Sequence, residues 1–179
     1  RCVELARRMH KPVLVLCFNK TLASRLEQLM VQHDVHDRVA VRHFHGWCKE
    51  QLQTYGVRTP PSQPSPDRYA AALVDAVVAG LESNAVPRAQ YGAVLIDEGH
   101  DFAPEWLQLV SQMVDPETNS LLLLYDDAQT LYGAGARRKF SFASVGIQAR
   151  GRTTILRLNY RNTLEVLSVA KAFAEEVLA

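Results

Sequence analysis

The stretch Tyr91-Gly-Ala-Val-Leu-Ile-Asp-Glu-Gly-His-Asp101 is the part of the sequence from which the fold can be worked out. Its first half is apolar and has no polar alternation, which is typical of a β-strand covered on both faces of a sheet. Two adjacent carboxylates, Asp97 and Glu98, follow this strand directly. In open α/β sheets, ligands bind at the carboxyl ends of the strands. We therefore expect a ligand site where these two carboxylates emerge.

The two carboxylates can serve different partners, because adjacent residues at a strand end point in different directions. One can hold Mg²⁺ through its waters, while the other orients and deprotonates an attacking water. The alternative is structural, since an Asp-Glu pair after a strand can simply cap the following helix. The strand and its carboxylates alone favour nucleotide hydrolysis and helix capping about equally.

The rest of the chain alternates between strand and helix patterns. Short apolar runs predict four buried parallel strands and a weaker fifth, at Val13–Phe18, Ala93–Ile96, Leu121–Tyr125 and Thr154–Leu158, then Val39–Phe44. Helical patterns occupy Thr21–Val31, Gly46–Tyr55, Asp67–Glu82, Pro104–Met113 and Thr163–Leu178. This order predicts an α/β layered fold with a mainly parallel sheet and right-handed crossovers.

Length and composition are those of one ordinary domain. The chain has 179 residues, 47% hydrophobic and 22% charged, so it is neither disordered nor fibrous. Its longest apolar runs are about six residues, against the roughly 20 that a membrane span needs, and no secretory signal is visible. The three cysteines, Cys2, Cys17 and Cys48, cannot all pair. Reduced thiols in a cytoplasmic protein are the simpler interpretation.

Two features concern domain organisation. The stretch 59–66 holds four prolines and predicts a stiff, exposed connection rather than a domain boundary, because strand patterns resume after it. Arg1–His10 has the pattern of the tail of a helix, and the chain ends within another helical pattern. We expect residues 1–179 to form one incomplete domain of a longer protein.

Charge is distributed unevenly along a chain whose net charge is only +1. Residues 82–127 hold nine acidic side chains and one basic side chain, whereas residues 128–164 hold seven basic side chains and no acidic one. Such asymmetry can place a metal-binding carboxylate cluster beside an anion-binding surface. Charge alone, however, favours two differently solvated faces.

A second buried strand ends in a comparable way. Asp126 and Asp127 follow the apolar run that begins at Leu121, and Gln129 lies two residues beyond them. A neutral amide there could sense a terminal phosphate, since it both donates and accepts hydrogen bonds. Taken alone, an acidic turn with a solvated glutamine explains this segment better.

Five motifs occur in an order that resembles one family of motor proteins. They are Leu16-Cys-Phe-Asn-Lys20, Phe44-His-Gly-Trp47, Ile96-Asp-Glu98, Asp126-Asp-Ala-Gln-Thr-Leu-Tyr132 and Leu158-Asn-Tyr-Arg-Asn162. Over about residues 13 to 165 the chain resembles the UvrD/Rep-like superfamily 1 helicases, and most of all the branch often fused to nuclease-related domains. The resemblance implies a first RecA-like motor domain, which is a P-loop NTPase three-layer sandwich. It also implies ATP hydrolysis with Mg²⁺ and 3′-to-5′ movement on single-stranded DNA.

The resemblance implies roles for individual residues. Asp97 matches the family's Mg²⁺ carboxylate and Glu98 its general base, while Gln129 matches the residue that couples the γ-phosphate to the DNA site. Tyr132 matches an aromatic that stacks on the adenine. Arg161 lies in a motif whose arginine approaches phosphate or holds the domain interface.

DNA contacts are implied at the ends of two other strands, at Phe18, Asn19, Lys20, Phe44 and His45. Aromatic rings next to cations are what sequence-tolerant single-strand binding uses, which supports this interpretation. Without the resemblance, Phe44 and Trp47 are better explained as core aromatics at a strand–helix junction.

The sequence departs from the family in several places. It has no G-x-x-x-x-G-K-[ST] phosphate loop, and the nearest glycine pair, Gly133-Ala-Gly135, lacks the lysine. We expect that loop upstream of Arg1 and the second motor domain beyond Ala179, so this fragment alone is not expected to hydrolyse ATP.

Two substitutions are smaller departures. His100 stands where the family usually has glutamine, and a neutral imidazole can donate and accept hydrogen bonds as the amide does. Gly133 replaces a phosphate-contacting arginine. Arg137 or Arg138 is a candidate substitute, although a solvated loop cluster explains these charges equally well.

A zinc site is the rival interpretation of one cluster, formed by His33, His36, His43, His45 and Cys48. Strand alternation puts His43 and His45 on one face, but tetrahedral zinc needs two more well-placed ligands. The sequence therefore favours a strand-dependent ATPase, whose partners are single-stranded or partly duplex DNA and the other domains of the parent helicase. The alternatives are an ATPase switch of the same sheet class, and a degenerate motor domain that only binds DNA or protein.

Overall fold

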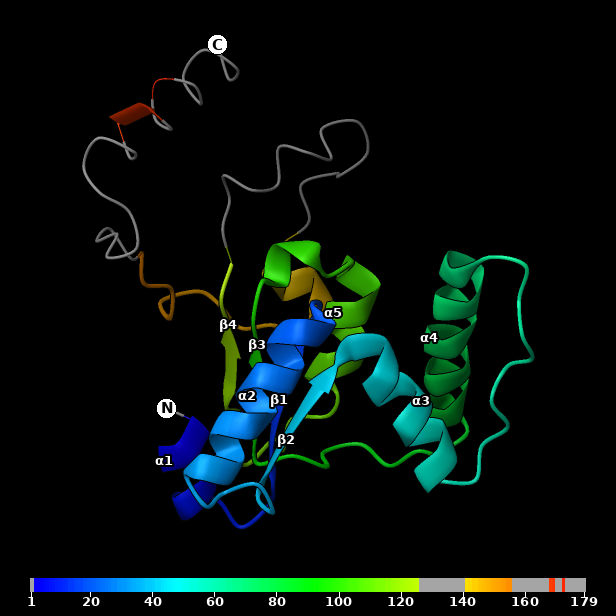
Figure 1. Cartoon of the computed structure of the whole chain (residues 1–179), viewed down its shortest axis with the longest axis horizontal. Coiled ribbons are helices and arrows are strands. Elements are labelled where there is room, and N and C mark those ends of the chain that lie inside the picture. Colours follow the sequence, from blue (N-terminus) through cyan, green and yellow to red (C-terminus); the bar gives the residue numbers. More distant parts are fainter. Residues whose placement is uncertain (1, 126–140, 156–167, 170–171, 173–179) are drawn as a thin grey trace. The chain divides into compact units, whose positions relative to one another are not determined.

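The computed structural model describes residues 2–125, 141–155, 168–169 and 172. The chain divides into two compact units, Arg1–Ile147 and Gln148–Ala179. The first unit contains a parallel sheet flanked by helices (Figure 1). The predicted α/β class with a parallel sheet is therefore confirmed. No helix among the described residues is long and apolar enough to cross a membrane.

The sheet has four strands in the described residues, and all three pairings are parallel. The strands are β1 (Val13–Cys17), β2 (Val39–His43), β3 (Ala93–Ile96) and β4 (Leu121–Leu123), in the order β2-β1-β3-β4. Because the strands run the same way, their carboxyl ends meet at one side of the sheet. This side is called the carboxyl edge below.

The predicted strands agree with these bounds to within two residues, with one exception. The run Thr154–Leu158 was expected to form a further strand. Thr154 and Ile155 lie in no strand, and residues 156–158 lie outside the described residues. The expected helix Thr163–Leu178 falls mostly outside them as well.

Helices α1 (Cys2–Arg8) and α2 (Lys20–Gln32) cover one face of the sheet. Successive side chains of a strand point to opposite faces. Val13, Val15 and Cys17 therefore pack into one cluster with Ala6 of α1 and Met30 of α2. The intervening residues Leu14 and Leu16 are fully buried as well, which shows that the other face is also covered. This burial on both faces explains the lack of polar alternation in β1.

Helices α3 (Phe44–Thr54) and α4 (Pro66–Glu82) lie side by side (Figure 1). The Ser65 hydroxyl accepts a hydrogen bond from the backbone N–H of Arg68 at 3.2 Å, and Pro66 occupies the first turn, where its missing N–H is not needed. Residues 57–63, between the two helices, form neither helix nor strand. The proline-rich stretch is thus a connection within the unit Arg1–Ile147.

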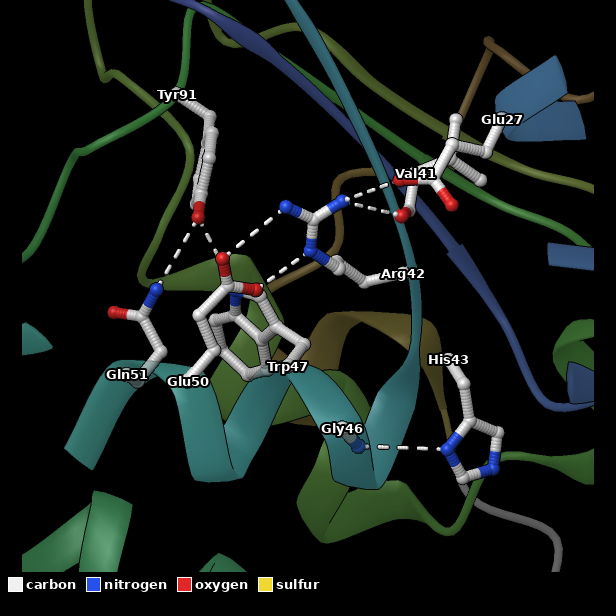
Figure 2. A network of polar contacts seen from close by, with 9 residues as sticks. All are labelled: Glu27, Val41, Arg42, His43, Gly46, Trp47, Glu50, Gln51 and Tyr91. Atoms are coloured by element: carbon white, nitrogen blue, oxygen red, sulfur yellow. Dashed lines mark hydrogen bonds and ion pairs between the residues drawn. The ribbon is translucent and has the colours of Figure 1, made fainter. Parts of the chain in front are cut away.

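A polar network holds β2 between the helices on its two sides (Figure 2). The Arg42 guanidinium donates to Glu50 of α3 through Nε at 2.6 Å and Nη2 at 3.1 Å, and through Nη1 to Glu27 of α2 at 3.3 Å. A two-point contact with a carboxylate fixes orientation as well as distance. Arg42 therefore connects the end of β2 to both α2 and α3.

The Tyr91 hydroxyl supports the same helix from the segment before β3. Its oxygen accepts hydrogen bonds from Trp47 Nε1 at 3.1 Å and from Gln51 Nε2 at 3.2 Å, and all three side chains are buried (Figure 2). Burial raises the pKa of the Tyr91 phenol. The phenol thus stays protonated and holds α3 against the chain that leads into β3.

Strand β4 differs from the expectation that every strand is buried on both faces. Leu121, Leu122 and Leu123 are only half-buried, and the neighbouring Leu124 is 46% exposed. The physical reason is position, since β4 is the last strand of the sheet in the described residues. Apolar residues on an edge strand invite pairing with another chain.

We therefore predict that the chain self-associates through β4 or is poorly soluble. The Leu122→Lys variant should be more monodisperse in light scattering, because a charge on an edge strand opposes edge-to-edge pairing. Val31→Lys is the matched control, since Val31 is 57% exposed on α2. A monodisperse, monomeric wild-type chain would contradict the prediction.

Candidate functional site

The two carboxylates leave β3 through a strained turn at the carboxyl edge. The backbone N–H of Asp97 donates to Leu16 O of β1 at 3.0 Å, so Asp97 is still tied to the sheet. Glu98 then adopts the left-handed conformation, with φ 52° and ψ 48°. For a residue with a side chain this costs on the order of 1–3 kcal/mol, and such strain concentrates at functional sites.

Position 99 requires a glycine, because β4 lies too close to leave room for a Cβ. The N–H of Gly99 donates to Leu124 O at 2.8 Å, and a Cβ on Gly99 would lie 2.3 Å from Cδ1 of Leu123. The short 3₁₀ turn Gly99–Asp101 follows. In the sequence Asp97-Glu98-Gly99, backbone hydrogen bonds thus hold the residue on each side of Glu98.

The helix-capping explanation of Asp97 and Glu98 is wrong for this structure. Helix α5 (Pro104–Ser111) begins several residues later, with Ala103 at its N-cap and no side-chain capping bond. Glu98 precedes the 3₁₀ turn, but its carboxylate caps nothing there. Instead, Asp97 Oδ1 accepts from the N–H of Glu98 at 3.1 Å. Both side chains are only partly buried, so they remain open to a ligand.

His100 lies beside the Glu98 carboxylate. The distance from His100 Nδ1 to Glu98 Oε2 is 3.5 Å, and the His100 side chain is only 7% exposed, against 43% for Glu98. The imidazole also meets the ring of Tyr125 edge to face, with centroids 6.2 Å apart. His100 is therefore part of the carboxylate turn.

A cluster of aromatic rings occupies the carboxyl edge beside this turn. It joins Phe18 after β1, the segment His43–His45 at the junction of β2 and α3, and Phe102 and Trp106 after β3. Trp106 is the centre of the cluster: its ring centroid lies 4.8 Å from that of Phe44 and 4.8 Å from that of His45. Phe18, Phe44 and His45, which the sequence analysis named as DNA contacts, lie together in this cluster, and the sequence analysis did not single out Trp106. The signal was available, since Trp106 follows the carboxylates by eight residues on a predicted helix.

The members of the cluster differ in exposure. Phe18 is 39% exposed and Trp106 is half-buried, whereas Phe44 is fully buried. The expectation that Phe44 contacts DNA directly does not fit this burial, because a fully buried ring is not accessible to a ligand. The Phe44 ring packs against the other rings of the cluster instead. Trp47 is also buried, so the interpretation of Phe44 and Trp47 as core aromatics is confirmed.

Asn19 and Lys20 lie at the start of α2, next to Phe18. Asn19 Oδ1 accepts from the backbone N–H groups of Thr21 at 2.8 Å and Leu22 at 3.1 Å, which makes it the helix cap. Its oxygen is thus engaged within its own helix. Lys20 is exposed, and it supplies a positive charge at the carboxyl edge.

The two histidines of the cluster are held in the neutral form. Burial lowers the pKa of both imidazoles, and the charge of Lys20 lowers it further. Neutral His43 accepts through Nδ1 from the N–H of Gly46 at 3.4 Å and so caps α3 (Figure 2). His45 Nε2 is buried and has no hydrogen-bond partner among the described residues. Protonation would remove the cap and place a charge in a poorly solvated position.

The zinc interpretation finds no support in the described part of the chain. No group of three or more His, Cys, Asp or Glu side chains there is placed to hold a metal ion. The rings of His43 and His45 lie 5.5 Å apart, but Cys48 is fully buried and burial raises the pKa of its thiol. Cys17 is buried beside Asp97, and burial raises its pKa to about 11. Both thiols therefore stay protonated.

Several predicted residues lie outside the described residues. They are Asp126, Asp127, Gln129, Tyr132, Gly133, Gly135, Arg137, Arg138 and Arg161. The structure thus shows the first carboxylate turn and the aromatic cluster, and it does not describe the second acidic turn.

A separate cavity of about 480 Å³ lies beside β2 and α3. Its lining includes Arg42 of β2, Trp47, Glu50 and Gln51 of α3, and Gln90 and Tyr91 of the segment before β3. No residue of the predicted ligand site borders it.

Comparison with known proteins gives no identification. No family model, curated protein or solved structure matches this chain.

We predict that Gly99→Ala lowers the free energy of unfolding by about 1–3 kcal/mol, because the added Cβ overpacks against Leu123. Urea unfolding measures this difference. Gly46→Ala is the control: the nearest atom to its added Cβ is 3.9 Å away and the site is helical, so that variant should be neutral or slightly more stable. Equal stability of Gly99→Ala and wild type would show that β4 can move away.

We also predict that stability falls on acidification. The pKa of His43 and of His45 is lowered in the folded state, so between that lowered value and the ordinary value near 6.5 the unfolded chain binds more protons. The free energy of unfolding should therefore be level above about pH 7 and should decrease below about pH 6.5. Replacing both residues (His43→Asn, His45→Gln) should flatten this dependence, whereas His33→Gln, at an exposed position, should not.

Proposed function

We propose that this chain is part of the first RecA-like motor domain of an ATP-dependent DNA helicase or translocase. The observation that carries the proposal is the turn at Asp97 and Glu98. It places two accessible carboxylates, one of them on strained backbone, at the carboxyl edge of a parallel sheet. The order of the five motifs supports the same function, and the four-stranded parallel sheet is compatible with a RecA-like sandwich.

The donor set at the turn fits a nucleotide bound with Mg²⁺. Asp97 Oδ1 already accepts from the N–H of Glu98, which fixes the carboxylate and leaves Oδ2 for a cation through its waters. When bound, Mg²⁺ and ATP supply the phosphoryl group and the charge neutralisation that its transfer needs. Asp97 is the residue that would hold the cation.

Glu98 is the proposed general base. Its left-handed backbone turns the side chain away from the strand direction, and 43% of the side chain is exposed, so a water can reach it. His100 Nδ1 lies 3.5 Å from Glu98 Oε2, which limits the positions that the carboxylate can take. Catalysis of this kind depends on positioning and charge stabilisation rather than on a covalent intermediate.

The DNA side of the proposal rests on the aromatic cluster and Lys20. Both lie at the carboxyl edge, as do the carboxylates, so a bound strand and a bound nucleotide would share one side of the sheet. Gln129, Tyr132 and Arg161 remain the residues proposed for phosphate sensing, adenine stacking and the domain interface. A cytoplasmic location also remains part of the proposal.

The test is ATP turnover by the full-length protein that contains this chain, with and without single-stranded DNA. Glu98→Gln should lower kcat by about 10² or more while nucleotide binding is retained, because it removes the base but not the site. Glu82→Gln is the matched control, since Glu82 is exposed at the end of α4.

The other outcomes distinguish the alternatives. Turnover that needs Glu98 but does not respond to DNA would indicate an ATPase switch. The absence of turnover in both proteins would indicate a domain that only binds DNA or protein.

A further inference from the structure

Tyr91 brings a hydroxyl group to the wall of the cavity beside β2 and α3. The residue is 8% exposed, and its oxygen accepts hydrogen bonds from Trp47 Nε1 and Gln51 Nε2 (Figure 2). A phenolic oxygen that accepts twice can form one more bond, by donating its own hydrogen. No acceptor for this hydrogen lies in the part of the chain that the structure describes. A buried donor therefore remains available at the cavity wall.

The direction of these hydrogen bonds follows from groups that can act in only one way. Pro87 O can only accept, so the Gln90 side chain presents its nitrogen there, at 2.9 Å. The same nitrogen donates to Gln51 at 2.7 Å, so Gln51 presents its oxygen to Gln90 and its own nitrogen to Tyr91. The indole of Trp47 can only donate. Neither neighbour can therefore accept the hydrogen of Tyr91.

One positive charge at the same cavity has no acidic partner among the described residues. The Arg88 guanidinium is exposed and donates to the neutral side-chain oxygens of Gln112 at 3.1 Å and Asn84 at 3.2 Å. The other charged side chains of the described lining, Arg42 and Glu50, pair with each other. This lining thus carries one unmatched positive charge, which a group with a single negative charge would neutralise.

The rest of the wall suits a small apolar group. Pro12 and Pro87 present ring carbons, and Tyr55, which follows α3, is 37% exposed. A volume of about 480 Å³ is that of a site for a small organic ligand or a few residues of a peptide. The cavity thus combines apolar surface with a buried hydroxyl donor and a guanidinium.

We propose that this cavity binds a carboxylate carried beside an apolar or aromatic group. Tyr91 donates to a carboxylate oxygen, and Arg88 supplies the opposite charge. The carboxylate comes either from a small organic acid or from an acidic side chain of a peptide, and the two sources are separated by experiment. No residue of the carboxyl edge site borders the cavity, so the proposal does not depend on the nucleotide or on DNA.

The indole N–H of Trp47 reports on a ligand at Tyr91. When the Tyr91 hydroxyl donates to a ligand, its oxygen becomes a stronger acceptor for this N–H, because consecutive hydrogen bonds polarise one another. The chain has two tryptophans, so a nitrogen–proton correlation spectrum contains two indole signals, which Trp106→Phe assigns. Titration with phenylpropionate should shift the Trp47 signal and leave that of Trp106, which does not line the cavity, in place. Millimolar affinity is expected for a ligand of this size.

Variants of Arg88 test the charge. Arg88→Gln should weaken binding of phenylpropionate about threefold or more, Arg88→Lys should recover part of the loss, and added salt should weaken binding to the wild type. Arg58→Gln is the matched control, since Arg58 is exposed in the connection after α3 and does not line the cavity. Tyr91→Phe is less informative, because it leaves Trp47 Nε1 and Gln51 Nε2 without their acceptor and so lowers stability.

Two further probes complete the experiment. Phenylpropanol lacks the charge and should bind more weakly than phenylpropionate. A blocked peptide with one glutamate beside a phenylalanine offers the carboxylate from a side chain. A shift of the Trp47 signal with the free acid alone supports a small-molecule site, and a shift with the peptide alone supports a site for a protein segment.

Two results would overturn the proposal. If Arg88→Gln binds phenylpropionate as tightly as the wild type does, or if phenylpropanol binds equally well, the cavity does not select a carboxylate. If neither acidic probe shifts the Trp47 signal at about 20 mM, the cavity is not a carboxylate site and water satisfies the Tyr91 hydroxyl. Far-UV circular dichroism checks that each variant is folded.

Discussion

The close contact between Gly99 and β4 is the constraint on which the carboxyl edge depends. The N–H of Asp97 donates to Leu16 of β1 and the N–H of Gly99 donates to Leu124, directly after β4, so hydrogen bonds fix the chain on each side of Glu98. Glu98 lies between Asp97 and Gly99, whose N–H groups are both held, and it adopts the left-handed conformation. The carboxylate consequently faces His100 and solvent instead of the start of α5.

The same segment also connects the carboxylates to the aromatic cluster. From Glu98 the chain passes through the 3₁₀ turn to Phe102 and then to Trp106, within eight residues. Phe102 and Trp106 both contact Phe44, which follows β2. A displacement of the carboxylate turn would therefore also displace Phe102 and Trp106. This is a mechanical connection built from packed side chains rather than from a polar relay.

The sequence predicted well the strands whose pattern is determined by burial. It predicted less well the features that depend on contacts between segments distant in the chain. Unalternating apolar runs predicted β1 and β3 because both strands are covered on both faces. β4 has the same pattern but is half-exposed, and no local signal distinguishes an edge strand from a central one. Trp106 was overlooked because its role arises from Phe18 and Phe44, which are 88 and 62 residues away in the sequence. The strain at Glu98 could not be read from residue types, since it results from hydrogen bonds to two other strands.

The connection between α3 and α4 has a different kind of consequence. Residues 57–63 form no helix or strand, and the two helices that they join pack against each other. The free energy of closing such a loop rises only slowly with its length, by about 0.6 kcal/mol for each doubling. Extra sequence at this point would therefore leave the sheet and its carboxyl edge almost undisturbed. Over evolutionary time, this connection is the place where the unit can acquire additional structure without losing its site.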